Sequence, residues 1–281
     1  MSRASLETVL LVLLLVLPGC LHQEVEDAGL LIATTTSMRD SGLMDALIEA
    51  FESSAGIEVE YVAVGTGAAL ELGREGDVDM VIVHAPDREQ VFLDSGSGSN
   101  RTTFAWNRFV LLSPTSPSPG TNLTETMRNI IEEDACFISR GDDSGTHTKE
   151  QAIWAEVGEN HGMSMVEDDL GLHPSWSGYL SSGQGMAASL TMADELDCWC
   201  LSDRGTYLNL RGGLDLHPIE FQESMLVNPY SALLLSGPQE RQMDAVRFTN
   251  WLVSPEAVQV IESHEVDGEM LFVPGSPDQV V

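Results

Sequence analysis

The stretch Leu30-Leu-Ile-Ala-Thr-Thr-Thr-Ser37 sets the architecture of this chain. Its four apolar residues predict a short buried strand, and the four hydroxyl residues that follow predict a polar loop. In residues 42–53 the apolar side chains recur at helical spacing, so a helix follows the loop. The stretch therefore opens a unit made of a strand, a loop and a helix.

The same unit recurs further along the chain. Residues 57–63 alternate apolar and polar side chains as a strand does, and Val64-Gly-Thr-Gly67 then leads into a short helix at 68–74. Residues 78–84 form a third, almost continuously apolar strand. Such strands with helices between them indicate an α/β fold with a parallel sheet covered on both faces.

A lobe boundary is predicted after the strand at 104–112, because residues 113–121 are rich in proline and small polar residues. The unit then recurs as a helix at 123–133, a strand at 135–139, a glycine-rich loop and a helix at 149–157 ended by Gly158. Further along we expect a helix at 186–195 and a strand at 198–201.

The end of the chain is predicted to return to the first lobe, through a strand at 229–235 and a helix at 239–253 that packs on that lobe. The expected division is therefore 1–20 for a leader, 21–112 and 226–281 for lobe 1, and 113–225 for lobe 2.

The first twenty residues have the features of an export signal. A short polar start with Arg3 precedes the apolar run 9–17, which is too short to span a bilayer. The sequence Leu17-Pro-Gly-Cys20 resembles the lipobox of lipoproteins, which implies that Cys20 is lipidated and that the protein is anchored to the outer face of the cytoplasmic membrane. Pro18 is unusual in a lipobox, so an ordinary secretory signal with an incidental cysteine remains the alternative.

Three further cysteines, Cys136, Cys198 and Cys200, allow at most one internal disulfide, and the sequence does not say which pair forms. Cys198 and Cys200 would lie on one face of a strand, a spacing that suits a soft metal. Partner ligands are lacking nearby, so we expect structural cysteines and no metal site.

The formal net charge of −31 comes from 44 acidic and 13 basic residues, with Lys149 as the only lysine. This balance excludes nucleic acid as an expected partner. The acids are spread along the whole chain, a distribution typical of surfaces adapted to strong brine, where charges are screened over about 3 Å at 1 M salt.

Three loops share a design that suits a small anion. Residues 34–37, 65–67 and 140–147 each follow a strand, are rich in Gly, Ser and Thr, and lead into a helix. Free N–H groups at a helix start carry roughly +0.5 charge, and hydroxyl groups add neutral donors. Each loop alone could be only a turn or a helix cap, but together they predict an anion site at the strand ends.

The third loop, Ser139-Arg-Gly-Asp-Asp-Ser-Gly-Thr-His147, is the most informative, because Arg140 supplies a planar fork of donors that suits a tetrahedral oxoanion. Ser144, Gly145 and Thr146 stand beside it at a helix start. In the alternative interpretation, Arg140 pairs with Asp142 or Asp143 and only ties the loop together. Both can hold, since a guanidinium has two edges.

At these residues the chain resembles the substrate-binding proteins of tungstate-uptake ABC transporters. The resemblance covers nearly the whole chain after the leader and is carried by residues 34–52, 62–86, 139–150, 201–207 and 227–230. It implies a two-lobed type II periplasmic-binding-protein fold with mixed sheets flanked by helices and the ligand in the cleft between the lobes.

The same resemblance implies a site and partners. Tungstate, or molybdate, would be held by these residues: Thr35, Thr36, Thr66, Arg140, Ser144, Gly145 and Thr146. No cofactor and no catalysis are expected, and the partners would be the permease and ATPase subunits of an ABC transporter. The chain departs from the family's pattern in the glycine-rich stretch 182–188, where Ala187 and Ala188 stand in place of glycine and another small residue, which puts contacts from that loop in doubt.

Two further positions belong to the resemblance without a fixed role. His84 could touch the ligand, but we favour a hydrogen bond that closes its strand. Asp203 and Arg204 are expected to stabilise the lobes.

Two other functions compete. Arg140, Asp142 and the Ser-Gly-Thr run also resemble the loop of phosphate-binding transport proteins, in which an acid accepts the proton of the ligand. Tungstate is fully deprotonated near neutral pH and needs donors only. A secreted serine hydrolase using Ser144 is the remote alternative, but the Gly-x-Ser-x-Gly elbow is missing and His147 lies on the same turn.

Overall fold

One continuous mixed sheet runs through both halves of the protein. The computed structural model describes residues 29–116, 122–237 and 242–277. The predicted leader and the lipidation of Cys20 lie outside these residues. Within them the strand order is β2-β1-β3-β11-β4-β9-β5-β8, and β10 and β14 also pair with β4.

The strands and helices have these bounds. The strands are β1 (Leu30–Thr35), β2 (Val59–Val64), β3 (Met80–Val83), β4 (Gly98–Ser113), β5 (Phe137–Ser139), β6 (Met165–Asp168), β7 (Gly171–Pro174), β8 (Tyr179–Ser181), β9 (Trp199–Asp203), β10 (His217–Ile219), β11 (Val227–Leu235), β12 (Glu265–Val266), β13 (Glu269–Met270) and β14 (Val273–Pro274). The helices are α1 (Thr36–Asp40), α2 (Leu43–Ala55), α3 (Thr66–Glu75), α4 (Pro86–Asp94), α5 (Leu123–Glu132), α6 (Gly145–His161), α7 (Met186–Glu195), α8 (Arg204–Leu210), α9 (Met243–Leu252) and α10 (Pro255–Ser263), with short 3₁₀ turns at Arg211–Gly213 and Ser224–Leu226.

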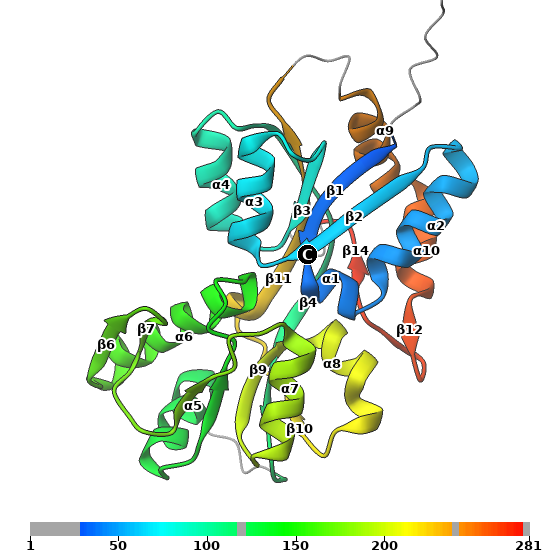
Figure 1. The fold of residues 1–281 in the computed structure, drawn as a ribbon. Helices are drawn as coiled ribbons and strands as arrows, with labels where there is room; N and C mark the ends of the chain where they lie inside the picture. The colour runs from blue at the N-terminus through cyan, green and yellow to red at the C-terminus, as the bar shows by residue number, and fades with distance from the viewer. Residues whose placement is uncertain (1–28, 117–121, 238–241, 278–281) are drawn as a thin grey trace, which may run out of the picture.

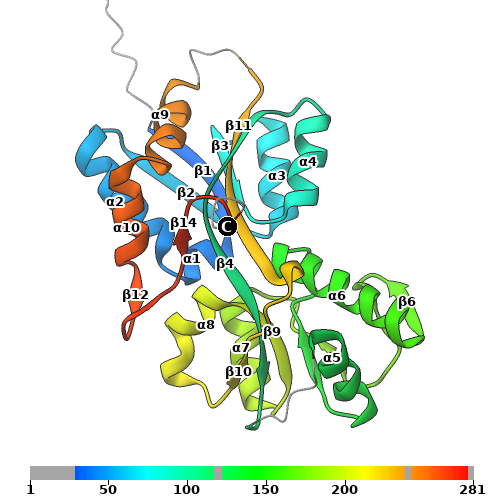
Figure 2. The ribbon, with the colours of Figure 1, turned by 180° about the vertical axis from the view of Figure 1, so that it is seen from behind.

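Two long strands join two lobes (Figures 1 and 2). We call lobe 1 the half with β1–β3, α1–α4, α9 and α10, and lobe 2 the half with α5–α8, β5 and β8–β10. The strands β4 and β11 run from one to the other. β4 pairs with β11 along most of its length and with β9 and β10 near its end. The sheet is parallel in its outer parts and antiparallel in the middle, which confirms the two-lobed α/β fold with mixed pairing.

Helices cover both faces of the sheet, and the cores differ between the faces. On one face a single hydrophobic core passes through both lobes and includes residues of α2, α9 and α10 from lobe 1 and of α7 and α8 from lobe 2. On the other face the core under α5 and α6 and the core under α3 and α4 are separate clusters. The lobes therefore share apolar packing on one side of the molecule only. The prediction that the last long helix packs on lobe 1 is confirmed, because α9 contacts β11 and α2.

The predicted bounds differ most from the structure for helix α6 and strand β4. Helix α6 begins at Gly145 and continues through Gly158 to His161, where Gly162 ends it in the left-handed conformation. Gly158 lies inside the helix for a packing reason. A Cβ at this position would lie only 2.9 Å from Cγ of Met165, so the glycine leaves room for β6. Strand β4 begins at Gly98, six residues before the prediction.

The cysteine pairing that the sequence left open is resolved. Cys136 and Cys198 form a disulfide with a Cα–Cα distance of 4.9 Å, and Cys200 is a buried free thiol. The disulfide joins the residue before β5 to the residue before β9. Because Cys198 is already bonded, it cannot join Cys200 as a pair of thiolate ligands.

No helix in the described parts of the chain combines the length and the apolar character that crossing a membrane requires.

A buried acid lies in the core of lobe 2. Oε1 of Glu150, in α6, accepts hydrogen bonds from the hydroxyl of Tyr179 at 2.6 Å and from Nε1 of Trp154 at 3.2 Å. Burial is the main cause that raises the pKa of Glu150 to about 7. The folded state therefore holds a proton on this group at pH values where an unfolded chain has lost it.

This acid should make stability depend on pH. Below pH 4.5, the ordinary pKa, Glu150 is protonated in both the folded and the unfolded chain, and its contribution to the free energy of unfolding is fully present. This contribution is lost as pH rises from 4.5 to about 7, the pKa in the folded state. In Glu150→Gln the amide oxygen keeps both hydrogen bonds and no charge is buried. We expect the variant to gain on the order of 3 kcal/mol relative to wild type between pH 4.5 and 8. Denaturant unfolding at both pH values measures this gain, and Glu156→Gln, on the exposed side of α6, should show none. An equal difference at both pH values would contradict it.

Candidate anion-binding site

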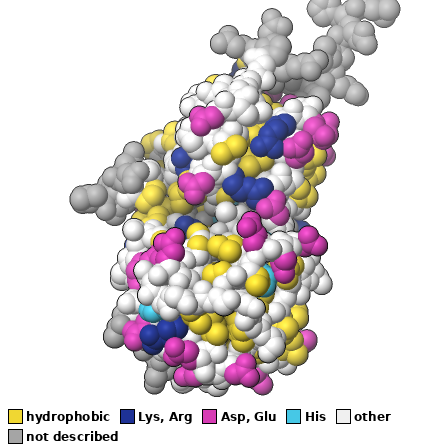
Figure 3. Space-filling view, turned by 90° about the vertical axis from the view of Figure 1, so that its left-hand side faces the viewer, with side chains coloured by type: hydrophobic (Ala, Val, Ile, Leu, Met, Phe, Trp, Pro, Cys, Tyr) yellow, Lys and Arg dark blue, Asp and Glu magenta, His cyan; other side chains and the backbone are white. Residues whose placement is uncertain are grey.

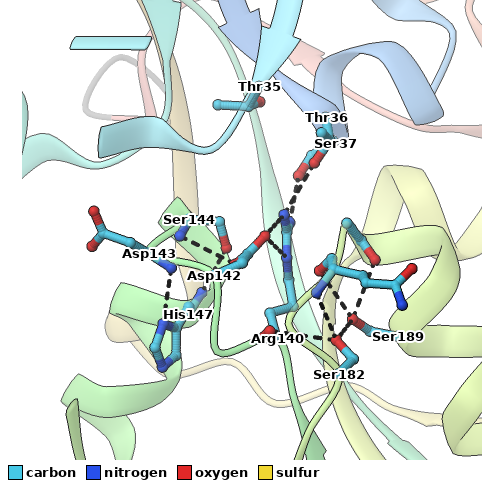
Figure 4. Close-up of polar contacts among 12 residues, drawn as sticks. Thr35, Thr36, Ser37, Arg140, Asp142, Asp143, Ser144, His147, Ser182 and Ser189 are labelled. Carbon is cyan, nitrogen blue, oxygen red and sulfur yellow. Dashed lines mark hydrogen bonds and ion pairs between the residues drawn. The ribbon is translucent and has the colours of Figure 1, made fainter. Parts of the chain in front are cut away.

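The three predicted loops meet where the lobes face each other. The loop after β1 belongs to lobe 1, as does the loop after β2, and the loop after β5 belongs to lobe 2. All three follow the carboxyl ends of strands in the parallel parts of the sheet, where α/β folds place ligands. Figure 4 shows the first and third loops opposite each other, with Arg140 reaching from lobe 2 toward lobe 1.

In the first loop the hydroxyl groups have different duties. Oγ1 of Thr35 accepts the N–H of Met38 at 3.4 Å and so caps α1. Thr36 and Ser37 turn their hydroxyl groups to Arg140. The prediction named Thr35 and Thr36 and missed Ser37, although Ser37 stands in the same hydroxyl run and is fully buried.

The second loop places Thr66 at the first position of α3, after Gly65. Its hydroxyl is buried and has no hydrogen-bond partner among the described residues. A Cβ on Gly65 would lie 3.0 Å from the carbonyl oxygen of Asp142, so this loop contacts the third one directly. The glycine permits that approach between the lobes.

The third loop carries the arginine. Arg140 is 1% exposed, and its guanidinium donates four hydrogen bonds within the described chain. Nε and Nη2 donate to Oδ2 of Asp142 at 3.1 and 2.5 Å, Nη2 donates to Oγ1 of Thr36 at 3.0 Å, and Nη1 donates to Oγ of Ser37 at 3.4 Å. A guanidinium has five N–H groups, so one on Nη1 is left for a further acceptor.

The pairing with Asp142 that the alternative interpretation expected is present. The arginine is tied to Asp142 within its own loop, and the other edge of the guanidinium crosses to lobe 1 (Figure 4). Oδ1 of Asp142 accepts the N–H of Ser144 at 3.2 Å, so both carboxylate oxygens are hydrogen-bonded. Asp142 holds the arginine in place at a helix start.

The same loop ends in the N-terminus of α6. Ser144 is its N-cap and accepts the N–H of His147 at 3.2 Å, and Gly145 and Thr146 form the first turn. The hydroxyl of Thr146 is buried and, like that of Thr66, has no partner among the described residues. Buried hydroxyl groups are normally hydrogen-bonded, so these two donors suit a ligand that supplies oxygen atoms.

The first turns of the four helices that start around the site contain no acidic residue. The first turns of α1, α3, α6 and α7 contain no Asp or Glu. Those of α2, α4, α5, α9 and α10 each contain at least one. The first turn of α8 also contains none, but Asp203 is the N-cap of that helix. An acid in the first turn neutralises the positive end of the helix dipole. In a chain with 44 acids, this pattern keeps the partial positive charge available where the loops meet.

His84 closes its strand as predicted. Its Nδ1 lies 2.8 Å from Oδ1 of Asn228, and its ring stacks on Tyr230 with the centroids 4.7 Å apart. Burial lowers the pKa of His84 to about 4, so the ring is neutral at neutral pH. Asn228 also donates to Asn107 and to the hydroxyl of Tyr230. These polar groups join β3, β4 and β11 where the lobes meet, and Asn228 was not among the predicted site residues.

The loop at 182–185, between β8 and α7, contacts the backbone of Arg140. Oγ of Ser182 lies 3.4 Å from the carbonyl oxygen of Arg140 and 2.7 Å from the hydroxyl of Ser189. A Cβ on Gly185 would lie 3.5 Å from Oγ1 of Thr36, so the start of α7 also faces lobe 1.

Asp203 and Arg204 stabilise the lobes, in agreement with the prediction. Asp203 caps α8 by accepting the N–H of Thr206 at 2.9 Å. Arg204 ion-pairs with Glu220 at 2.8 Å and with Glu269 of β13 at 2.6 Å. The second of these pairs joins lobe 2 to the C-terminal part of the chain.

The geometry around Ser144 does not resemble a catalytic triad. Nδ1 of His147 accepts the N–H of Asp143 at 3.2 Å, and Nε2 lies 2.9 Å from the carbonyl oxygen of Leu170. The imidazole therefore has its two nitrogens engaged away from the hydroxyl of Ser144.

The fold and the three loops together define a two-lobed α/β protein of the binding-protein class, with a candidate anion site where the lobes face each other. A family model described as a PBP superfamily domain matches residues 22–256. The tungstate-binding protein TupA of Peptoclostridium acidaminophilum is 35% identical over 292 aligned positions, covering 97% of this chain and 98% of the relative. The chain belongs to the PBP superfamily and, within it, to the family of the TupA proteins.

Solved structures agree with this assignment. The tungstate-binding protein TupA from Desulfovibrio alaskensis G20 has a TM-score of 0.70 at 33% identity, covering 88% of this chain and 98% of that one. A tungstate ABC transporter protein from Geobacter sulfurreducens has a TM-score of 0.70 at 35% identity, covering 84% and 98%.

Proposed function

We propose that this protein binds tungstate between its lobes and delivers it to an ABC transporter. The observation that carries the proposal is the buried Arg140, which reaches from the loop before α6 to the start of α1, among four helices with acid-free first turns: α1, α3, α6 and α7. The ligand would be held by these residues: Thr35, Thr36, Thr66, Arg140, Ser144, Gly145 and Thr146. The relatives named above as tungstate-binding proteins support the choice of anion.

The acids of the loop favour a fully deprotonated anion over phosphate. A phosphate site needs a carboxylate oxygen that can accept the remaining proton of the ligand. Asp142 already accepts from Arg140 and Ser144, and Asp143 is paired with Arg88. Tungstate and molybdate, which carry no proton near neutral pH, need only the donors that the site supplies. The site binds reversibly, and no catalytic step is part of the proposal.

Titration calorimetry with four anions tests the function. We expect tungstate to bind tightly and molybdate to compete with it, because the two have the same charge and nearly the same size. Sulfate and phosphate should bind far more weakly. Tight phosphate binding without tungstate binding would overturn the proposal, and heat in none of the four titrations would do so too.

The proposal extends to the location of the protein. An export signal at 1–20, lipidation of Cys20 and anchoring to the outer face of the cytoplasmic membrane fit a binding protein that passes its ligand to a permease. The lobes would divide at 112 and 225. The acids spread over both lobes in Figure 3 fit a surface adapted to brine.

A further inference from the structure

On the face where the lobes share no core, they are joined by an ion pair. The cores under α3 and α4 and under α5 and α6 are separate there. Between them, Arg88 of α4 pairs with Asp143 of the loop before α6. Nη1 and Nη2 donate to the two carboxylate oxygens at 2.7 and 2.8 Å, a bidentate arrangement.

Arg88 also holds the backbone of the same residue. Its Nη1 donates to the carbonyl oxygen of Asp143 at 2.9 Å. The N–H of Asp143 donates to Nδ1 of His147, so the residue is held on both sides of its Cα. Asp143 has a φ of 55°, a conformation that costs a non-glycine residue free energy unless its surroundings fix it.

The position of this pair connects it to the anion site. Asp143 lies directly between Asp142, which holds Arg140, and Ser144, which caps α6. The second loop leaves room for the pair, because a Cβ on Gly67 would lie 2.2 Å from Oδ2 of Asp143 and 2.8 Å from Nη2 of Arg88. Arg88 therefore braces the anion loop from the opposite lobe.

We propose that Arg88 is a positioning residue that latches the closed cleft and slows the escape of the bound anion. The inference rests on the proposed function. Opening the cleft on this face must break three hydrogen bonds to Asp143, none of which involves the ligand. The latch stabilises the closed state, so its loss should raise the rate of anion release more than it changes the rate of capture.

The latch should respond to salt. The side chains of Arg88 and Asp143 are 28% and 71% exposed, and a pocket of about 310 Å³ lined by Gly67, Arg88 and four neighbours opens beside them. Charge pairs in contact with solvent weaken as salt rises. The buried contacts of Arg140 lack this access, so salt separates the latch from the ligand contacts.

The test measures release of radiolabelled tungstate into excess unlabelled tungstate. In Arg88→Gln and Asp143→Asn we expect release to be about three- to tenfold faster than in wild type. Asparagine tolerates the left-handed conformation, so the second change removes the charge without adding backbone strain. The double variant should release the anion no faster than the faster single variant, because both single changes remove the same ion pair. Arg88→Lys keeps the positive charge, so its release rate should lie between those of wild type and Arg88→Gln.

Arg74→Gln is the matched control. Arg74 lines the same pocket and is 36% exposed, but it pairs with Glu71 inside lobe 1. Its release rate should equal that of wild type. The difference between Arg88→Gln and wild type should shrink at about 1 M salt. Unchanged release in Arg88→Gln, additive effects in the double variant, or an equal effect of Arg74→Gln would overturn the latch.

A second readout needs no anion. Small-angle X-ray scattering of ligand-free protein should give a larger radius of gyration for Arg88→Gln than for wild type and for Arg74→Gln. If wild-type protein takes up no tungstate, the proposed function fails, and the scattering comparison alone decides on the latch. Identical scattering of all three proteins would then reject it.

Discussion

Arg140→Ala is expected to lower the affinity for tungstate by on the order of 10²-fold or more, which corresponds to roughly 2–5 kcal/mol for a buried charged contact. The reason is the position of the guanidinium, which is almost fully buried and reaches across the cleft to Thr36 and Ser37. At −31 net charge the protein provides no long-range attraction for an anion. Binding therefore depends on donors at contact distance, and Arg140 is the one with a full charge among the residues proposed to hold the anion. Titration calorimetry measures the loss.

Two further variants separate ligand binding from a structural role of Arg140. Asp142→Asn weakens the tie within the loop but keeps the positive charge, so its loss should stay within about tenfold if Arg140 binds the anion. Arg39→Ala removes an exposed charge from α1 that pairs with Asp40, and its affinity should match that of wild type. An equal loss in Arg140→Ala and Asp142→Asn would mean that Arg140 only ties the loop together. Thermal unfolding without ligand checks that each variant is folded.

The three loops could be predicted from the sequence, because the donors that they offer follow from their own residues. Hydroxyl residues and glycine between a strand and a helix imply free donors wherever the loop lies. Arg140 was predicted for the same reason, since it is the basic residue of the glycine-rich loop. The absence of acids from the first turns of α3 and α6 was also readable, once the helix starts were known to face one another.

The contacts that hold the loops together were not readable, since they join distant residues. Arg88 and Asp143 are 55 positions apart and come from different lobes. The early part of β4 is polar and becomes a strand through its pairing with β11, as in the contact between Thr103 and Ser231 at 3.0 Å. The disulfide between Cys136 and Cys198 likewise needed the adjacency of β5 and β9. Such pairings follow from the assembled sheet and leave no local pattern.

Gly145→Val is expected to lower the affinity for tungstate by about 10- to 100-fold, although the residue contributes no side chain. A Cβ at this position would lie 3.0 Å from Cε1 of His84 and 3.2 Å from its carbonyl oxygen. His84 cannot move aside easily, because it is bonded to Asn228 and stacked on Tyr230. The added methyl groups would therefore keep α6 away from lobe 1, at a cost of about 1–3 kcal/mol in the closed state.

A graded series makes this prediction specific. Gly145→Ala adds only the Cβ and should lose less affinity than Gly145→Val, and Gly212→Val should lose none, since a Cβ there meets nothing within 4 Å. Without ligand the cleft can open and relieve the clash, so the melting temperature of ligand-free Gly145→Val should stay close to that of wild type. Added tungstate should raise it less than in wild type. Wild-type affinity in the valine variant would show that the anion is held without the close approach of Gly145 to His84, and that the lobes need not meet here for binding.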